Sequence, residues 1–142
     1  MAKGPKGVLL IEHYVAPSPI HGFGTYSAVF VSKGEKVWEF HPAINRIIPA
    51  SDFEGLPRHV LASIESRAEY LEEQGAFLTS LDGDQFTNHS DEPNTVKRGS
   101  EWFAAQDIYP GEELTCDYRQ TLVLGYDPAT GLPFKQPQIS VS

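Results

Sequence analysis

The chain contains 142 residues, with 11 lysines and arginines against 19 aspartates and glutamates, so its formal net charge is −8. This length favours a single domain over residues 1–142 that folds without staples, and the one cysteine excludes an intramolecular disulfide and a zinc site built from several thiolates. The acidic balance argues against direct binding to nucleic-acid phosphates and leaves a basic protein partner open.

Apolar stretches are short. The longest runs, such as Val8–Ile11, fall far below the ~20 residues that a membrane-spanning helix needs. No apolar segment follows Met1 closely enough to act as a secretory signal. We therefore expect no membrane partner and a cytoplasmic location, with the nucleus left open.

The first third of the chain predicts short strands separated by turns. Val8–Val15 is rich in β-branched and aromatic residues, which favour a strand. Ala28–Val31 and Lys36–Phe40 flank the turn sequence Ser32-Lys33-Gly34-Glu35, and this arrangement predicts a hairpin. A further strand is expected over Ala43–Ile48.

The segment Arg58–Glu73 predicts the main helix. Its apolar side chains recur at three- and four-residue steps, as they do on one face of a helix: Val60, Leu61, Ile64, Ala68 and Leu71. Gly75 follows as a plausible C-cap. The polar face is acidic and is expected to be solvated, with Glu65, Glu69, Glu72 and Glu73.

The rest of the chain returns to strands and turns. Strands are expected over Ala76–Ser80, Thr95–Lys97, Trp102–Ile108 and Glu113–Cys116. The sequence Tyr109-Pro110-Gly111-Glu112 places Pro and Gly at the two central positions of a type II turn. From Arg119 onward the chain is rich in Gly and Pro and is expected to be loop-like. The overall pattern predicts a mostly β domain with one helix and an irregular C-terminal segment.

Three stretches carry residues suited to binding or catalysis. The first contains His21-Gly22-Phe23-Gly24, whose glycines allow a ligand to approach the backbone closely. The second runs over Asp84–Asn94 and contains Asn88-His89-Ser90, and the third runs over Gly111–Tyr118. Taken singly, each also fits an ordinary turn, polar loop or edge strand. The five histidines share no ligand-like spacing, so we expect no metal site.

In this order and spacing, the three stretches resemble the SET-domain protein-lysine methyltransferases. The resemblance covers about Val15–Tyr118 and rests on Gly22-Phe23-Gly24, on Phe86-x-Asn88-His89-Ser90-x-x-Pro93-Asn94 and on Gly111-Glu112-Glu113-Leu114-Thr115-x-Asp117-Tyr118. It implies a β-clip-like fold of small β-sheets with one main helix and a C-terminal pseudoknot. It also implies a SET core at about residues 10–120 and a tail at about 121–142 that closes the lysine channel.

The resemblance further implies an enzyme that transfers a methyl group from S-adenosylmethionine to the lysine ε-amine of a protein substrate. His21, Gly22, Phe23 and Gly24 are implied to bind the methionine end of this cofactor. Asn88 and His89 are implied to bind it as well, His89 mostly through its backbone at the adenine. Tyr118 matches the tyrosine whose hydroxyl lies beside the transferred methyl, and is the implied catalytic residue.

Three further residues are candidates for the substrate channel. Cys116 stands where many relatives carry Phe or Tyr, which implies room for higher methylation states; the other interpretation is a small buried hydrophobic residue. Phe77 is placed on the channel by the resemblance. The zinc-binding modules of the family are absent, so the tail, with Tyr126, is the candidate for closing the channel.

Two other functions remain open at this stage. A catalytically idle SET fold would bind the cofactor or a basic peptide as an interaction module, and a methyltransferase for a small amine would differ only in its channel. The acidic balance suits a basic, lysine-containing segment as substrate. Exposed sheet edges in a small β domain make a homodimer possible.

Overall fold

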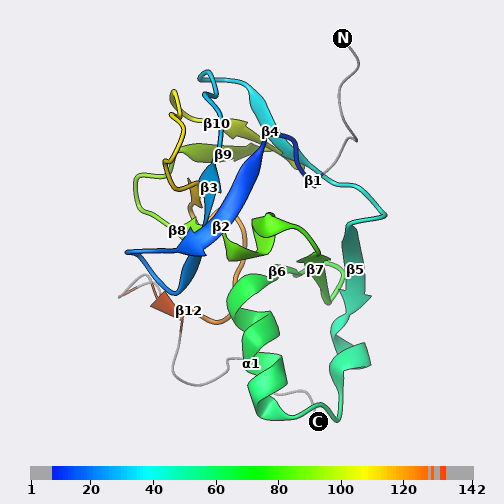
Figure 1. Cartoon of the computed structure of the whole chain (residues 1–142). Helices are drawn as coiled ribbons and strands as arrows, with labels where there is room; N and C mark the ends of the chain where they lie inside the picture. The colour runs from blue at the N-terminus through cyan, green and yellow to red at the C-terminus, as the bar shows by residue number, and fades with distance from the viewer. Residues whose placement is uncertain (1–7, 128, 130–131, 134–142) are drawn as a thin grey trace.

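The computed structural model describes residues 8–127, 129 and 132–133 of the chain. A four-stranded antiparallel sheet has the order β1 (Val8–Leu9), β4 (Lys36–Glu39), β10 (Glu101–Ala104), β9 (Thr95–Arg98). A three-stranded antiparallel sheet has the order β5 (Asn45–Pro49), β7 (Ala76–Ser80), β6 (Glu69–Leu71). Figure 1 shows the first sheet in the upper part of the molecule and the second beside α1 (Arg58–Arg67).

The remaining strands form pairs. Two of them are antiparallel: β2 (His13–Pro17) with β3 (Phe23–Ser27), and β12 (Tyr126–Asp127) with β13 (Leu132–Pro133). The third is parallel and joins β8 (Asn88–His89) to β11 (Thr115–Cys116). Two short 3-10 helices, η1 (Ala50–Phe53) and η2 (Gly83–Phe86), complete the described elements. The predicted mostly β fold of small sheets with one main helix is confirmed.

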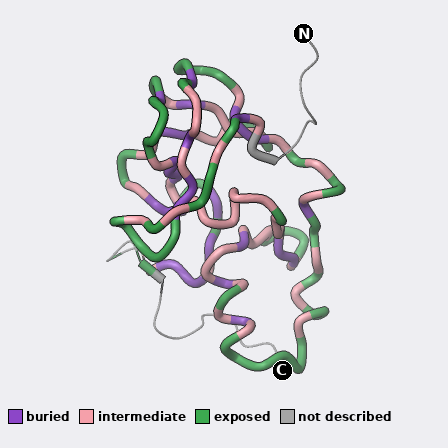
Figure 2. Tube along the Cα trace, viewed as in Figure 1, coloured by how far each residue is buried: buried purple, intermediate pink, exposed green. Residues whose placement is uncertain are grey.

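The main hydrophobic core lies against the four-stranded sheet. It contains Ile11, Val31, Val37, Trp38, Ala104, Ile108 and Leu114. Figure 2 shows buried stretches in the interior and exposed ones at the outer turns, including the residues that lead from η1 into α1. Within the described part of the chain, the helices lack the length and apolar character needed to cross a membrane.

The predicted hairpin of Ala28–Val31 with Lys36–Phe40 is wrong, although its turn is present. Glu35 N donates to Ser32 O over 3.0 Å, and Gly34 has a φ of +89°. However, β4 pairs with β1 and β10, while Val31 forms an isolated bridge with Ile108. The partners of β4 are distant in sequence, so residue spacing around the turn does not reveal them.

The helix is shorter than predicted. It ends at Arg67, and Ala68 has extended backbone angles of φ −90° and ψ 146°. The predicted last turn is instead β6, in which Glu69 pairs with Leu78 and Leu71 with Ala76. Gly75 is therefore not a helix C-cap; it lies in the turn from β6 to β7 with a φ of +59°. The helical period in this segment was overridden by the hydrogen bonds that β7 offers.

Other strand boundaries also shift. Val8–Val15 splits into β1 and β2, and Trp102–Ile108 keeps strand geometry only over β10, with Ile108 in its isolated bridge. The predicted type II turn is confirmed, because Glu112 N donates to Tyr109 O over 3.0 Å and Gly111 has a φ of +88°.

The C-terminal segment passes close to the helix and to β6. Leu122 O accepts a hydrogen bond from Tyr70 N over 2.7 Å, and Glu65 O accepts one from Gly125 N over 2.8 Å. A Cβ on Gly125 would lie 2.9 Å from the backbone of Glu65, so a glycine is needed at this crossing. These contacts and the parallel β8–β11 pair bring the C-terminal segment against the helix, β6 and the second motif.

One residue of the predicted solvated acidic face is buried. Only 2% of Glu65 is exposed, and its Oε1 lies 3.8 Å from the Arg58 guanidinium. Glu72 and Glu73 are exposed as predicted, whereas Glu69 is half-buried and paired with Lys97 over 2.9 Å. The C-terminal segment covers the Glu65 side of the helix, which a helical wheel cannot anticipate.

Candidate active site

Tyr118 lies at the junction of the second and third motifs. The β8–β11 pairing sets Cys116 beside His89, so Tyr118 follows directly behind this pair. Its hydroxyl donates to Thr87 O over 2.5 Å, and its backbone N–H donates to His89 Nδ1 over 3.0 Å. Burial raises the pKa of the Tyr118 phenol well above its usual range, so this group is a neutral hydrogen-bonding hydroxyl and not a base at neutral pH.

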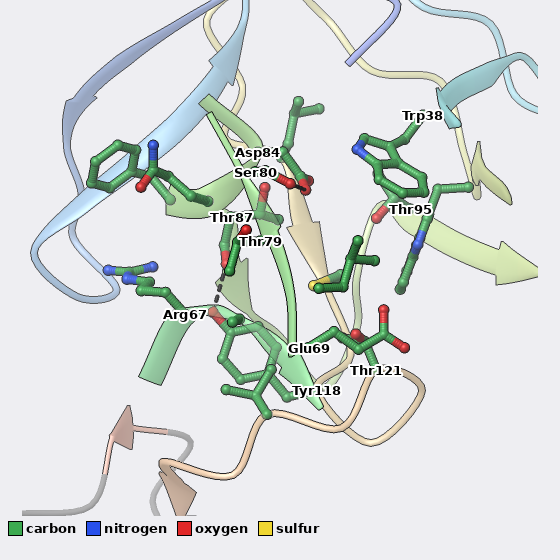
Figure 3. Close-up of a pocket in the computed structure, with 18 of the residues that line it drawn as sticks. Trp38, Arg67, Glu69, Thr79, Ser80, Asp84, Thr87, Thr95, Tyr118 and Thr121 are labelled. Atoms are coloured by element: carbon green, nitrogen blue, oxygen red, sulfur yellow. Dashed lines mark hydrogen bonds between the residues drawn. The ribbon is translucent and has the colours of Figure 1, made fainter. Parts of the chain in front are cut away.

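Tyr118 and Cys116 both line a cavity of about 420 Å³. Its lining residues come from β4, α1, β6, β7, η2, β9, β10, β11 and the C-terminal segment; Figure 3 shows ten of them labelled, among them Tyr118, Asp84 and Trp38. The polar and charged side chains on these walls include Arg67, Glu69, Thr79, Ser80, Asp84, Gln85, Thr87, Thr95 and Thr121. The apolar side includes Val37, Trp38, Leu78, Trp102 and Leu114. This volume lies in the range of small-molecule binding pockets.

Asn88 holds the glycine-containing loop in place. Its side-chain Nδ2 lies 3.1 Å from His21 O, 3.1 Å from Phe23 O and 2.9 Å from Glu113 Oε2. His21, Gly22 and Phe23 are exposed, whereas Asn88 is buried. The structure therefore brings these predicted cofactor-binding residues together on one face.

Glu113 is part of this arrangement, although from sequence it fits a surface acidic residue. Both carboxylate oxygens lie 2.8 Å from Ser18 Oγ, which donates to them. Gly24 packs directly against this carboxylate, because a Cβ at Gly24 would overlap it. Glu113 of the third motif thus contacts the first motif directly. A glycine at position 24 leaves room for its carboxylate.

Arg67 is a second residue that the sequence did not indicate. Its Nη1 donates to Asn88 Oδ1 over 3.3 Å, and its guanidinium lies over the Phe86 ring, 5.8 Å from the centroid. A Cβ on Gly22 would lie 3.9 Å from Arg67 Nη2. Arg67 also lines the cavity, so one guanidinium borders both the exposed loop and the cavity.

The ring of His89 is fully engaged inside the protein. Besides the bond from Tyr118 N, its Nε2 lies 2.9 Å from Asp91 Oδ1 and 3.0 Å from Tyr126 Oη. Tyr126 also packs edge-on against Tyr118, with ring centroids 5.3 Å apart. Tyr126, predicted on the channel, therefore supports Tyr118 from behind.

The other two channel candidates lie in different places. Cys116 is buried on the cavity wall, and burial raises the pKa of its thiol well above its usual range. Phe77 is only 2% exposed and packs between Phe53 and Tyr70, outside the cavity wall. Its neighbours in β7, Leu78 to Ser80, line the cavity instead. Of the predicted tail, residues 128, 130–131 and 134–142 lie outside the described residues.

The family model of the SET domain matches residues 22–119, which hold all three motifs. The chain belongs to the SET domain family. No curated protein matches it.

A solved structure has the same fold as this SET domain. It is a crystal structure from Plasmodium falciparum of a protein assigned as a histone methyltransferase. The two chains are 21% identical, with a TM-score of 0.50, and the match covers 76% of this chain and 93% of the other. At this sequence identity, the likeness shows a shared fold alone.

Proposed function

We propose that this SET domain is a protein-lysine N-methyltransferase that uses S-adenosylmethionine. The observation that carries the proposal is the position of Tyr118, whose buried hydroxyl lies on the cavity wall and donates to Thr87 O, one residue before Asn88. The Tyr118 side chain thus lies between the cavity and Asn88, which holds the loop of His21–Gly24. This is where a methyl donor on one side would meet an amine on the other.

The residues around the loop fit the cofactor. The carbonyl oxygens of His21 and Phe23 both accept from the Asn88 side-chain amide, which holds this exposed loop in one conformation, and their second lone pairs are acceptors suited to an ammonium group. The Arg67 guanidinium next to Gly22 offers a cation for a carboxylate. The methionine end of S-adenosylmethionine carries both an ammonium and a carboxylate, so it fits these acceptors and this cation. The exposed ring of Phe23, edge-on to Phe86 at 6.5 Å, supplies an aromatic surface beside it.

The cavity residues fit the amine. When bound, S-adenosylmethionine supplies an electrophilic methyl group on a positively charged sulfonium. The chain has to position a neutral amine in line with it, and such positioning is a large source of rate. Tyr118, fixed by Thr87 and His89, offers a hydrogen bond at the cavity wall. Close to the transferred methyl group, the positive sulfonium disfavours an ammonium by charge.

The acidic surface supports a basic segment as substrate. The net charge is −8, and opposite charges speed encounter with a lysine-rich segment. We propose on this basis that the cavity accepts a lysine side chain of a protein.

The deciding experiment uses radiolabelled S-adenosylmethionine with the full chain and a cell lysate, followed by identification of the labelled molecules. Label in protein lysines supports the proposal. Label in small molecules alone indicates a small-amine methyltransferase. Cofactor binding without transfer to any acceptor indicates a catalytically idle SET fold. The Tyr118→Phe variant is the control for label that other enzymes in the lysate transfer.

A further inference from the structure

A carboxylate that none of the three motifs requires lies on the cavity wall. Asp84 is in η2, and its Oδ2 accepts a hydrogen bond from Ser80 Oγ over 3.4 Å. Ser80 Oγ in turn accepts from Asn45 Nδ2 over 2.8 Å, and Asn45 is 1% exposed. The backbone N–H of Asp84 donates to Asp82 Oδ1. The carboxylate is therefore held in position by β5, β7 and the start of η2.

Two tryptophans line the same cavity. Trp38 is 6% exposed, and its Nε1–H is buried without a hydrogen-bond partner among the described residues. Trp102 contributes a second indole. In Figure 3, Trp38 and Asp84 occupy the upper part of the cavity, across from Tyr118. A buried donor with no protein partner indicates that a polar group enters this part of the cavity.

Most of the titratable groups around Asp84 are acidic. Burial, followed by the nearby Asp82 carboxylate, raises its pKa to about 7. The titratable groups that face it are Glu69, Cys116 and Tyr118 on the cavity wall, Asp82 on η2, and His13, whose ring packs on Gly83. Glu69 is already paired with Lys97 over 2.9 Å. Among the described residues, no basic side chain forms an ion pair with Asp84.

We propose that Asp84 binds the ammonium of the substrate in this cavity and takes its proton before methyl transfer. This rests on the proposed function. The N–H bond of the ammonium breaks, its electron pair stays on nitrogen, and the proton adds to an Asp84 carboxylate oxygen. The neutral amine then carries the lone pair that attacks the methyl carbon of the sulfonium, and the C–S electron pair leaves with sulfur.

The ligand class follows from the same surroundings. A carboxylate without a cationic partner recognises a cation, and indole faces attract an ammonium that has lost its water. The Arg67 guanidinium lies at the part of the cavity wall next to Asn88, and its positive charge repels an ammonium from that part. The ammonium is therefore directed toward Asp84. Among ligands of this size, a primary alkylammonium such as a lysine side chain satisfies these conditions.

The test measures binding of n-butylammonium, a probe for the lysine side chain, to the full chain by NMR chemical shifts. The probe keeps its charge below about pH 10. For the wild-type protein we expect the dissociation constant to fall about tenfold between about pH 5.5 and about pH 8, as Asp84 ionises. Asp84→Asn should bind about tenfold more weakly than the wild type at the higher pH and lose the pH dependence.

Asp82→Asn is the matched control, because this neighbour caps η2, which asparagine also does, and lies outside the cavity wall. It should keep the affinity and move the pH midpoint downward, since Asp82 raises the pKa of Asp84. Absence of binding, pH-independent binding to the wild type, or unchanged binding by Asp84→Asn would each overturn the proposal. The wild-type titration needs no variant and holds even if Asp84→Asn does not fold.

A lysine peptide assay separates this proposal from the proposed function. If Asp84→Asn methylates the peptide with an unchanged pH–rate profile, the proton-accepting role of Asp84 is refuted and the methyltransferase stands. If the wild type binds butylammonium as expected and methylates no lysine, the proposed function is refuted and only the ammonium-binding site remains.

Discussion

The side chain of His89 and the backbone of Tyr118 are directly joined. Tyr118 N donates to Nδ1 of His89 over 3.0 Å, so in this arrangement the ring proton is on Nε2. That nitrogen lies near both Asp91 and Tyr126. A histidine of the second motif therefore positions the tyrosine that ends the third.

Replacement of His89 by phenylalanine should destabilise the fold. The buried N–H of Tyr118 would lose its acceptor, and an unsatisfied buried donor costs about 1–3 kcal/mol. Urea unfolding monitored by fluorescence measures the free energy. Tyr126→Phe is the control, since it removes only one of the contacts at Nε2 and should cost about 1 kcal/mol or less. Equal losses in the two variants would contradict this role for Nδ1.

Tyr118→Phe should lower the methyl-transfer rate by about 100-fold, the effect typical of losing one positioned hydrogen-bond donor. Cofactor affinity should stay within about threefold of the wild type, because the loop contacts of Asn88 do not involve the phenol. Single-turnover rates and calorimetric binding of S-adenosylmethionine separate the two effects. Near-normal turnover would remove Tyr118 from the site.

Glu113→Ala should weaken S-adenosylmethionine binding by about tenfold while the chain stays folded. The carboxylate holds Ser18 and Asn88, and its loss frees the loop that carries His21 and Phe23. Isothermal calorimetry measures the affinity. Glu112→Ala serves as the matched control, because the exposed side chain of Glu112 accepts a hydrogen bond from Tyr109 N within its own turn. The same affinity in both variants would show that Glu113 does not order the loop.

Cys116→Tyr should shift the product toward monomethyl-lysine. Cys116 lines the cavity beside Tyr118, and a tyrosine there would fill space that extra methyl groups on the amine would need. Mass spectrometry of a methylated peptide counts the methyl groups, and Cys116→Ala, which keeps the space, should resemble the wild type. A wild-type product that is strictly monomethylated, together with no effect of the tyrosine, would support the interpretation of Cys116 as a small buried hydrophobic residue.

Asp84→Asn should stabilise the protein at alkaline pH. Folding raises the pKa of Asp84 from about 3.8 to about 7, so the folded state binds this proton more tightly. Its contribution to stability is complete below about pH 4 and is lost as the pH rises through 7. Asparagine avoids that loss, so the variant should gain on the order of 4 kcal/mol at pH 8 and almost nothing at pH 4. Thermal unfolding at both pH values measures it; a gain of equal size at pH 4 would exclude titration of Asp84 as its cause.

Local sequence determined the features that depend on near neighbours. Pro110 and Gly111 determine a type II turn, because one fixes φ and the other tolerates a positive φ. The strand predicted over Ala76–Ser80 coincides with the observed bounds of β7. The order of the three motifs indicated the family, and the family model covers the same region.

Tertiary structure decided what depends on distant partners. Glu69–Leu71 continues the helical period but forms a strand, because β7 supplies backbone hydrogen bonds there. Phe77 lies in the core and Glu65 under the C-terminal segment, since the packing of other elements determines which face is buried.

The candidate site divides in the same way. The motif residues Asn88, Cys116 and Tyr118 were found in sequence because their spacing is characteristic. Arg67 was not indicated, and Asp84 begins the second stretch but was given no role, since each reaches the cavity only through folding. A side chain's type and spacing are local properties, whereas its burial and the charges around it are set by residues that the chain brings together from far apart. The site residues of the motifs were therefore visible in the sequence, and the charge of the cavity was decided by the fold.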